Sequence, residues 1–65
     1  MGKLIELKKT LFEMGLTQKE LSKRAHIPEN WLSMAIRGRY ALSQRQREKI
    51  SSVLNKSITD LGLNN

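Results

Sequence analysis

Residues 18–37 read QKELSKRAHIPENWLSMAIR, and this stretch decides how the chain folds. Apolar residues recur at helical spacing in the first part of this stretch and again in its last part. His26, Ile27 and Pro28 lie between these two segments. Proline has no backbone N–H, so Pro28 suits a helix cap or a first helical turn and little else. The pattern predicts two short helices joined by a tight turn.

The second of these helices has two different faces. Four side chains recur at i, i+3, i+4 and i+7 and therefore share the outer face: Asn30, Ser33, Met34 and Arg37. Three apolar side chains fall on the opposite face and are predicted to point inward: Leu32, Ala35 and Ile36. An amide, a hydroxyl, a thioether and a guanidinium are groups able to contact base edges. On a basic chain, this outer face indicates DNA binding that reads sequence.

Length and charge limit what the chain can do. Its 65 residues predict a single domain over residues 1–65, with residues 63–65 frayed, and its lack of cysteine excludes disulfides and thiolate-metal sites. The formal net charge of +6 divides into +2 over residues 1–36 and +4 over residues 37–65. Positive charge speeds association with a polyanion, although a basic surface also serves solubility. The concentration of charge after the helix pair favours nucleic acid.

Capping signals and apolar stripes predict five helices in all. The first spans residues 3–14 and ends at Gly15, which provides a left-handed stop. Its inward side chains are expected to be Leu4, Ile5, Leu7, Leu11, Phe12 and Met14. Thr17 and Glu20 have the spacing of a capping box, which starts the second helix.

The last two predicted helices follow a loop after Gly38, the expected terminator of the third helix. Ser43 and Gln46 have capping-box spacing and start a fourth helix. Its inward residues are expected to be Ile50, Val53 and Leu54. Ser57 and Asp60 predict a fifth helix of a single turn. That turn would carry two apolar side chains to the core, Ile58 and Leu61.

Short motifs along most of the chain share the spacing of one known family. They are Gly15-Leu16-Thr17-Gln18, Glu20-Leu21, Ile27, Leu32-Ser33, Gly38-Arg39, residues 50–54 and residues 58–61. In this combination the chain resembles the Cro/CI-like (XRE) helix-turn-helix family of phage and bacterial regulators. The resemblance implies an all-α, compact, five-helix, lambda-repressor-like domain in which the helix of residues 29–37 reads the major groove.

The chain departs in three ways from the residues that the family usually has. Ser22 stands in place of alanine, and its hydroxyl is able to bond back to a carbonyl. His26 stands in place of glycine, so a positive φ there would strain the backbone. Leu11 and Ile36 stand where many members have a buried Arg–Glu pair. Because packed apolar residues commonly replace such a pair without loss of stability, we predict that Leu11 packs on Ile36.

The resemblance assigns base readout to side chains of the third helix: Glu29, Asn30, Ser33 and Met34. Asn30 is the best candidate, because its amide is able to make two hydrogen bonds to adenine; capping the helix is its other interpretation. Met34 suits a thymine methyl group, and Ser33 suits several base edges. Glu29 is able to accept from cytosine, but a carboxylate also favours a helix N-terminus.

Nine residues are expected to contact the DNA backbone: Thr17, Gln18, Lys19, Trp31, Arg37, Arg39, Tyr40, Ser43 and Gln44. Gln18 begins the second helix, where N–H groups bind phosphate; a solvated helix start is its other interpretation. Trp31 lies between the inner and outer faces, so a packing role competes with a phosphate contact. Arg37 suits phosphate better than guanine this far along the helix, and Arg39 suits the backbone or a narrow minor groove.

The residue types present argue against several other functions. With no cysteine, one histidine and no carboxylate pair in a plausible pocket, we expect no enzyme activity, no cofactor and no bound metal. The apolar runs are too short to span a bilayer, and no secretory pattern is present. We therefore expect a cytoplasmic protein, associated with the nucleoid of a bacterial cell or a phage-infected host.

Two hypotheses from different classes follow. The first is a small transcriptional regulator with operator DNA as its partner, most simply a Cro/CI-like repressor of a phage or mobile element. The second is a protein-interaction module, an antitoxin or antirepressor, that binds another protein through its helix-turn-helix surface. Its exposed anchors would be Trp31, Met34, Tyr40 and Leu63. The other partners considered are a protein antagonist and a second copy of the chain, with a dimer surface at Tyr40, Leu42, Leu61 and Leu63.

Overall fold

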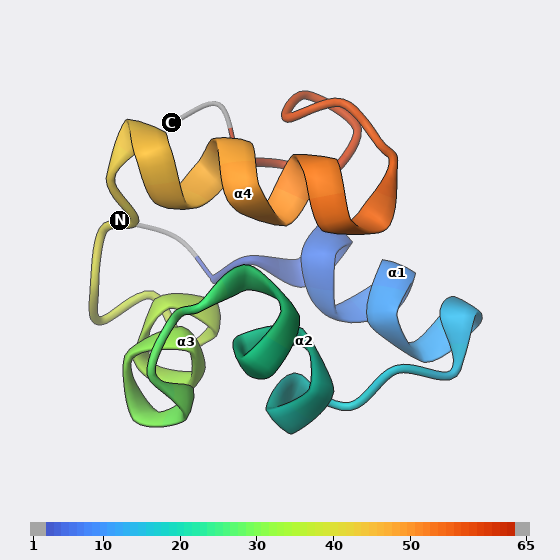
Figure 1. Cartoon of the computed structure of the whole chain (residues 1–65). Coiled ribbons are helices and arrows are strands. Elements are labelled where there is room, and N and C mark those ends of the chain that lie inside the picture. Colours follow the sequence, from blue (N-terminus) through green and yellow to red (C-terminus); the bar gives the residue numbers. More distant parts are fainter. Residues whose placement is uncertain (1–2, 64–65) are drawn as a thin grey trace.

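A computed structural model describes residues 3–63, in which four helices surround one core (Figure 1). The helices are α1 (Ile5–Met14), α2 (Gln18–Ala25), α3 (Glu29–Ile36) and α4 (Gln44–Leu54). α2 packs against both α3 and α4, and α1 packs against α3. Figure 1 shows α4 lying across the other three helices. The all-α architecture is the one that the sequence predicts.

Side-chain caps start α2 and α4, as the sequence predicts. At α2 the hydroxyl oxygen of Thr17 accepts from the backbone N–H of Glu20 at 3.1 Å, and the Glu20 carboxylate accepts from the N–H of Thr17 at 3.0 Å. Ser43 and Gln46 make the same reciprocal pair at α4, at 3.1 and 2.9 Å. Each capping box satisfies donors that a helix start leaves unpaired, so both starts are determined locally.

Left-handed residues end α1 and α2. Gly15 has a φ of 69°, as predicted for the stop after α1. His26 follows α2 with a φ of 56° and a ψ of 43°, a conformation in which glycine avoids the strain that a side chain brings. The hydroxyl of the buried Ser22 donates to the carbonyl oxygen of Lys19 at 2.8 Å, which is the back-bonding expected of it.

The prediction of a fifth helix is wrong, because residues 58–62 form a turn. The N–H of Asp60 donates to the hydroxyl oxygen of Ser57 at 3.0 Å, and the N–H of Leu61 donates to the Ser57 carbonyl at 3.1 Å. The N–H of Gly62 donates to the Thr59 carbonyl at 3.0 Å, and Gly62 adopts a φ of 67°, which ends the turn. The turn nevertheless brings Leu61 into the core, as expected.

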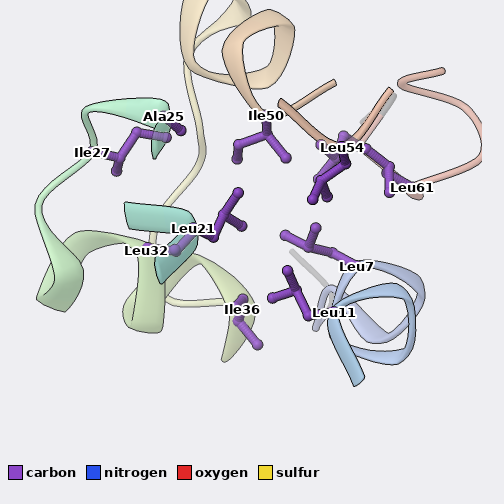
Figure 2. Packing of buried hydrophobic residues seen from close by; sticks show 11 residues of the cluster. Leu7, Leu11, Leu21, Ala25, Ile27, Leu32, Ile36, Ile50, Leu54 and Leu61 are labelled. Carbon is purple, nitrogen blue, oxygen red and sulfur yellow. The ribbon is translucent and has the colours of Figure 1, made fainter. Parts of the chain in front are cut away.

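One cluster of buried apolar side chains forms the core, and Figure 2 shows side chains from all four helices pointing into the same space. Its members are Leu7, Leu11, Leu21, Ala25, Ile27, Leu32, Ile36, Ile50, Leu54, Leu61 and Leu63. Leu11 and Ile36 both belong to the cluster, in agreement with the predicted apolar contact between α1 and α3. Leu63 is 2 % exposed, so it is packed rather than frayed; residues 64–65 lie outside the described part of the chain.

The outer face of α1 differs from the predicted one. Ile5 is 67 % exposed and Phe12 is 86 % exposed, although both were expected to widen the inward stripe. A helix turns by about 100° per residue, so both side chains lie on the side opposite Leu7 and Leu11. Thr10 occupies the inward position instead and is buried. Met14, which was also expected to point inward, is exposed at the end of α1.

Candidate nucleic-acid interface

The outer face of α3 is open, as the helical spacing predicts. Asn30, Met34 and Arg37 are exposed and Ser33 is half-buried. The three apolar residues of the opposite face are buried: Leu32, Ala35 and Ile36. Because the core anchors one side of this helix, the other side presents an amide, a hydroxyl, a thioether and a guanidinium in fixed order.

The start of α3 leaves the side chain of Asn30 without a capping role. Pro28 is the N-cap, with a φ of −53° and a ψ of 138°, and the cap has no side-chain hydrogen bond. Asn30 is instead the second residue of the helix, so the capping interpretation is wrong and the amide faces outward. Glu29 occupies the first turn, where a carboxylate interacts favourably with the helix dipole.

At the start of α2 the capping box occupies both donors of Thr17. Its N–H donates to the Glu20 carboxylate at 3.0 Å, and its hydroxyl donates to the same oxygen at 3.2 Å. These two bonds, the backbone one first, lower the pKa of Glu20 from its ordinary value of 4.5. Gln18 is half-buried and Lys19 is exposed. The bonds to Glu20 therefore leave Gln18 and Lys19, rather than the side chain of Thr17, as the candidates for a phosphate contact at this end of α2.

An aromatic pair lies between α3 and the loop that follows it. The rings of Trp31 and Tyr40 meet edge to face, with centroids 4.8 Å apart and planes at 74°. The hydroxyl of Tyr40 donates to Oε1 of Gln46 at 3.0 Å, and the same oxygen accepts from the N–H of Ser43 at 2.9 Å. Trp31 is thus packed on Tyr40 and still 47 % exposed, and its contact with a phosphate stays a prediction.

The remaining expected backbone contacts surround the loop after α3. Arg37 and Arg39 are both exposed, and the N–H of Arg39 donates to the Met34 carbonyl at 2.8 Å, which holds the loop against α3. Gln44 is exposed, but its amide donates to Glu48 at 3.1 Å. Arg37 and Arg39 are therefore positively charged side chains that lie close to the outer face of α3 and are open to a ligand.

Two residues of α4 have contacts that sequence reasoning missed. Gln46 was expected only to cap the helix, yet it also binds Tyr40. Arg47 contributes to the positive charge of residues 37–65, and its guanidinium donates to the Leu63 carbonyl at 3.1 Å and to Gln44 at 3.1 Å. Its Nε is buried without a hydrogen-bond partner. No local pattern signals either contact, because the partners approach only when the chain folds back.

Two of the four residues expected at a dimer surface lie inside the core of the protomer. Leu61 is fully buried and Leu63 is 2 % exposed, so neither offers its side chain to a second copy or to another protein. Leu42 packs partly buried against the core, and the hydroxyl of Tyr40 is already bonded. Only Tyr40 and Leu42 remain as candidates for that surface.

The part of the chain described, residues 3–63, holds no group of three or more histidine, cysteine or acidic side chains placed to bind a metal ion. None of its helices is long and apolar enough to cross a membrane. The model of a helix-turn-helix family matches residues 6–61, which cover the turn, most of the core and the aromatic pair. No curated protein matches the chain, and no solved structure does.

Proposed function

This chain belongs to the Cro/CI-type (XRE) helix-turn-helix family, whose members bind DNA and are not enzymes, and from that premise we propose that it is a small transcriptional repressor. In this proposal it comes from a phage or mobile element and acts on an operator inside the cell. α3 lies in the major groove and reads the operator through Asn30, Ser33 and Met34, with Glu29 at the helix start.

The observation that carries this proposal is the division of α3 into a buried face and an open face. Asn30, Met34 and Arg37 are exposed on the open face. Asn30 has the chemistry for a two-bond contact with adenine, which discriminates against other bases by about 1–3 kcal/mol. Met34 supports the proposal by offering an apolar surface to a thymine methyl group. A helix that served only to pack the core would not require an amide, a thioether and a guanidinium on its outer face.

In this proposal, positively charged residues that precede and follow α3 along the chain supply the affinity for DNA. Lys19 lies in the first turn of α2, and Arg37 and Arg39 follow α3; all three are exposed. Neutralising about five phosphates gives a slope near −4.5 when the logarithm of the binding constant is plotted against that of the salt concentration. Two copies on a palindrome, with half-sites about one helical turn apart, would double that slope.

Selection of bound duplexes from a random pool tests the function. The wild-type chain should enrich one motif, and Asn30→Ala should lose preference at one base position while keeping the rest. Ser52→Ala, on the exposed part of α4, is the matched control and should enrich the wild-type motif. If the wild-type chain enriches no motif, the proposed repressor function fails. If Asn30→Ala only weakens binding uniformly, Asn30 is a backbone contact instead.

A second candidate function, binding to another protein, is supported by the exposed apolar residues of α1. Phe12 is 86 % exposed and Ile5 is 67 % exposed, and neither belongs to the face proposed for DNA. Both side chains lie on the side of α1 opposite Leu7 and Leu11, and contiguous exposed apolar patches commonly mark interaction surfaces. Retention on heparin or nonspecific DNA at low salt separates the two functions. A chain that is not retained, and does not shift duplex DNA, would favour the protein-interaction module.

A further inference from the structure

α3 and α4 are held relative to one another mainly through α2. Extensive packing joins α2 to α3 and α2 to α4. A further link between α3 and α4 passes through side chains outside the core. Trp31 of α3 contacts the ring of Tyr40 in the loop, and the hydroxyl of Tyr40 is anchored on Gln46 of α4. We call these three residues, Trp31, Tyr40 and Gln46, the aromatic brace.

The hydroxyl of Tyr40 is able to bond Gln46 or a phosphate, and its hydrogen-bonding capacity excludes donating to both at once. A phenol has a single O–H proton, and this one is donated to Oε1 of Gln46 at 3.0 Å. An ionised phosphate oxygen only accepts hydrogen bonds. Tyr40 therefore cannot donate to a phosphate unless it first releases Gln46. A direct backbone contact through the hydroxyl, the role that the sequence suggested for this residue, would dismantle the brace.

Gln46 is in turn held in place by the chain around it. Its Oε1 accepts from the N–H of Ser43 at 2.9 Å as well as from Tyr40, so the orientation of its amide is determined by two donors. The N–H of Gln46 donates to the Ser43 hydroxyl oxygen at 3.1 Å, which ties the residue to the start of α4. The anchor of the brace is thus part of a helix and not of a loop.

We propose that Tyr40 is a positioning residue, which fixes α3 against α4 through the aromatic brace so that the base-reading face meets the groove in one orientation. Trp31 immediately follows Asn30 along α3, so a contact at the Trp31 ring restrains the part of the helix that carries the base-reading amide. This inference rests on the proposed function. It assigns to Tyr40 a contribution to sequence discrimination and none to the number of phosphates bound.

Three variants test the inference in the full chain: Tyr40→Phe, Gln46→Met and the double variant. Tyr40→Phe keeps the ring and removes only the hydroxyl; Gln46→Met keeps the side-chain length and removes the acceptor. The probes are the duplex that the wild-type chain selects from the random pool and a scrambled duplex of equal length and composition. The dissociation constant for each is measured over a series of salt concentrations, at a temperature where thermal unfolding shows every variant folded.

We expect Tyr40→Phe to lower the ratio of affinities for the selected and scrambled duplexes by about 3–10-fold, the loss of one hydrogen bond. The salt slope should stay at the wild-type value. The double variant should discriminate no worse than Gln46→Met alone, because both changes break the same link. A role in stability alone would lower the unfolding temperature and leave the ratio unchanged.

Two results would overturn the inference. One is a slope shallower by about one unit in Tyr40→Phe with equal losses on both duplexes, which would make the hydroxyl a phosphate contact. The other is an unchanged ratio, which would make the brace irrelevant to readout. Failure of the proposed function looks different, since the wild-type chain would then select no duplex at all. If Gln46→Met does not fold, Tyr40→Phe alone still decides between these outcomes.

Discussion

The backbone N–H of Leu4 donates to the carbonyl oxygen of Ile36 at 3.0 Å, so the residue that precedes α1 is bonded to the last residue of α3. Beside this bond, Leu11 and Ile36 are both buried in the core. A main-chain bond and apolar packing thus attach α3 to α1 here. No charge has to be desolvated, which a buried ion pair would require.

Truncation of Leu11 should therefore be severe. Leu11 is 3 % exposed, and Leu11→Ala is expected to lower the free energy of unfolding by about 2–5 kcal/mol, from a total of about 5 kcal/mol for a domain of this size. Urea denaturation followed by far-UV circular dichroism measures the change. Phe12→Ala is the matched control and should cost less than about 0.5 kcal/mol, because its side chain is 86 % exposed. Equal losses in the two variants would contradict the assigned orientation of α1.

Replacement of His26 by glycine should stabilise the chain. His26 has a φ of 56°, a region that costs a residue with a side chain about 1–2 kcal/mol. Glycine removes this strain but has more freedom in the unfolded chain, so a net gain of about 0.5–1 kcal/mol is expected. The midpoint of thermal unfolding should rise accordingly. Gly15→Ala supplies the opposite test: its φ is 69° and no atom lies within 4 Å of the added carbon, so backbone strain alone should destabilise it.

Acid should weaken the start of α2. The pKa of Glu20 in the folded chain lies below its ordinary value of 4.5, because its carboxylate accepts from the N–H and the hydroxyl of Thr17. Its contribution to stability is therefore complete above pH 4.5 and is lost as the pH falls through the folded pKa. Glu20→Gln keeps an acceptor and does not titrate. The wild-type chain should unfold at a higher temperature than this variant near neutral pH, and the difference should vanish in acid. A difference that is constant with pH would contradict the assignment.

Removal of Arg39 should weaken DNA binding without changing the preferred sequence. Arg39→Ala is expected to reduce the salt slope by about one unit and to weaken binding to selected and scrambled duplexes equally. Lys56→Ala removes the same charge from an exposed residue. Lys56 follows the C-terminal end of α4, whereas Arg39 precedes its N-terminal end. The slope of that control should match the wild type. A loss of preference at one base position in Arg39→Ala would instead place Arg39 in a groove.

Much of the fold was predictable because its signals are local. The capping boxes of Thr17 with Glu20 and of Ser43 with Gln46 join residues three apart, and both form as expected. The outer face of α3 follows from the helical period alone. The same period, applied strictly to α1, also places Phe12 on the outside, because adjacent residues of a helix lie about 100° apart around its axis.

The residues alone thus determined where α2 and α4 begin, which side of α3 faces out and which stop follows α1, since each depends on neighbours within about one helical turn. Tertiary structure alone decided that Arg47 binds the carbonyl of Leu63, that Leu63 is buried and that Tyr40 links Trp31 to Gln46. These contacts depend on the path of the loops after α3 and α4. Helical periodicity says nothing about that path, so their partners become neighbours only when the core closes.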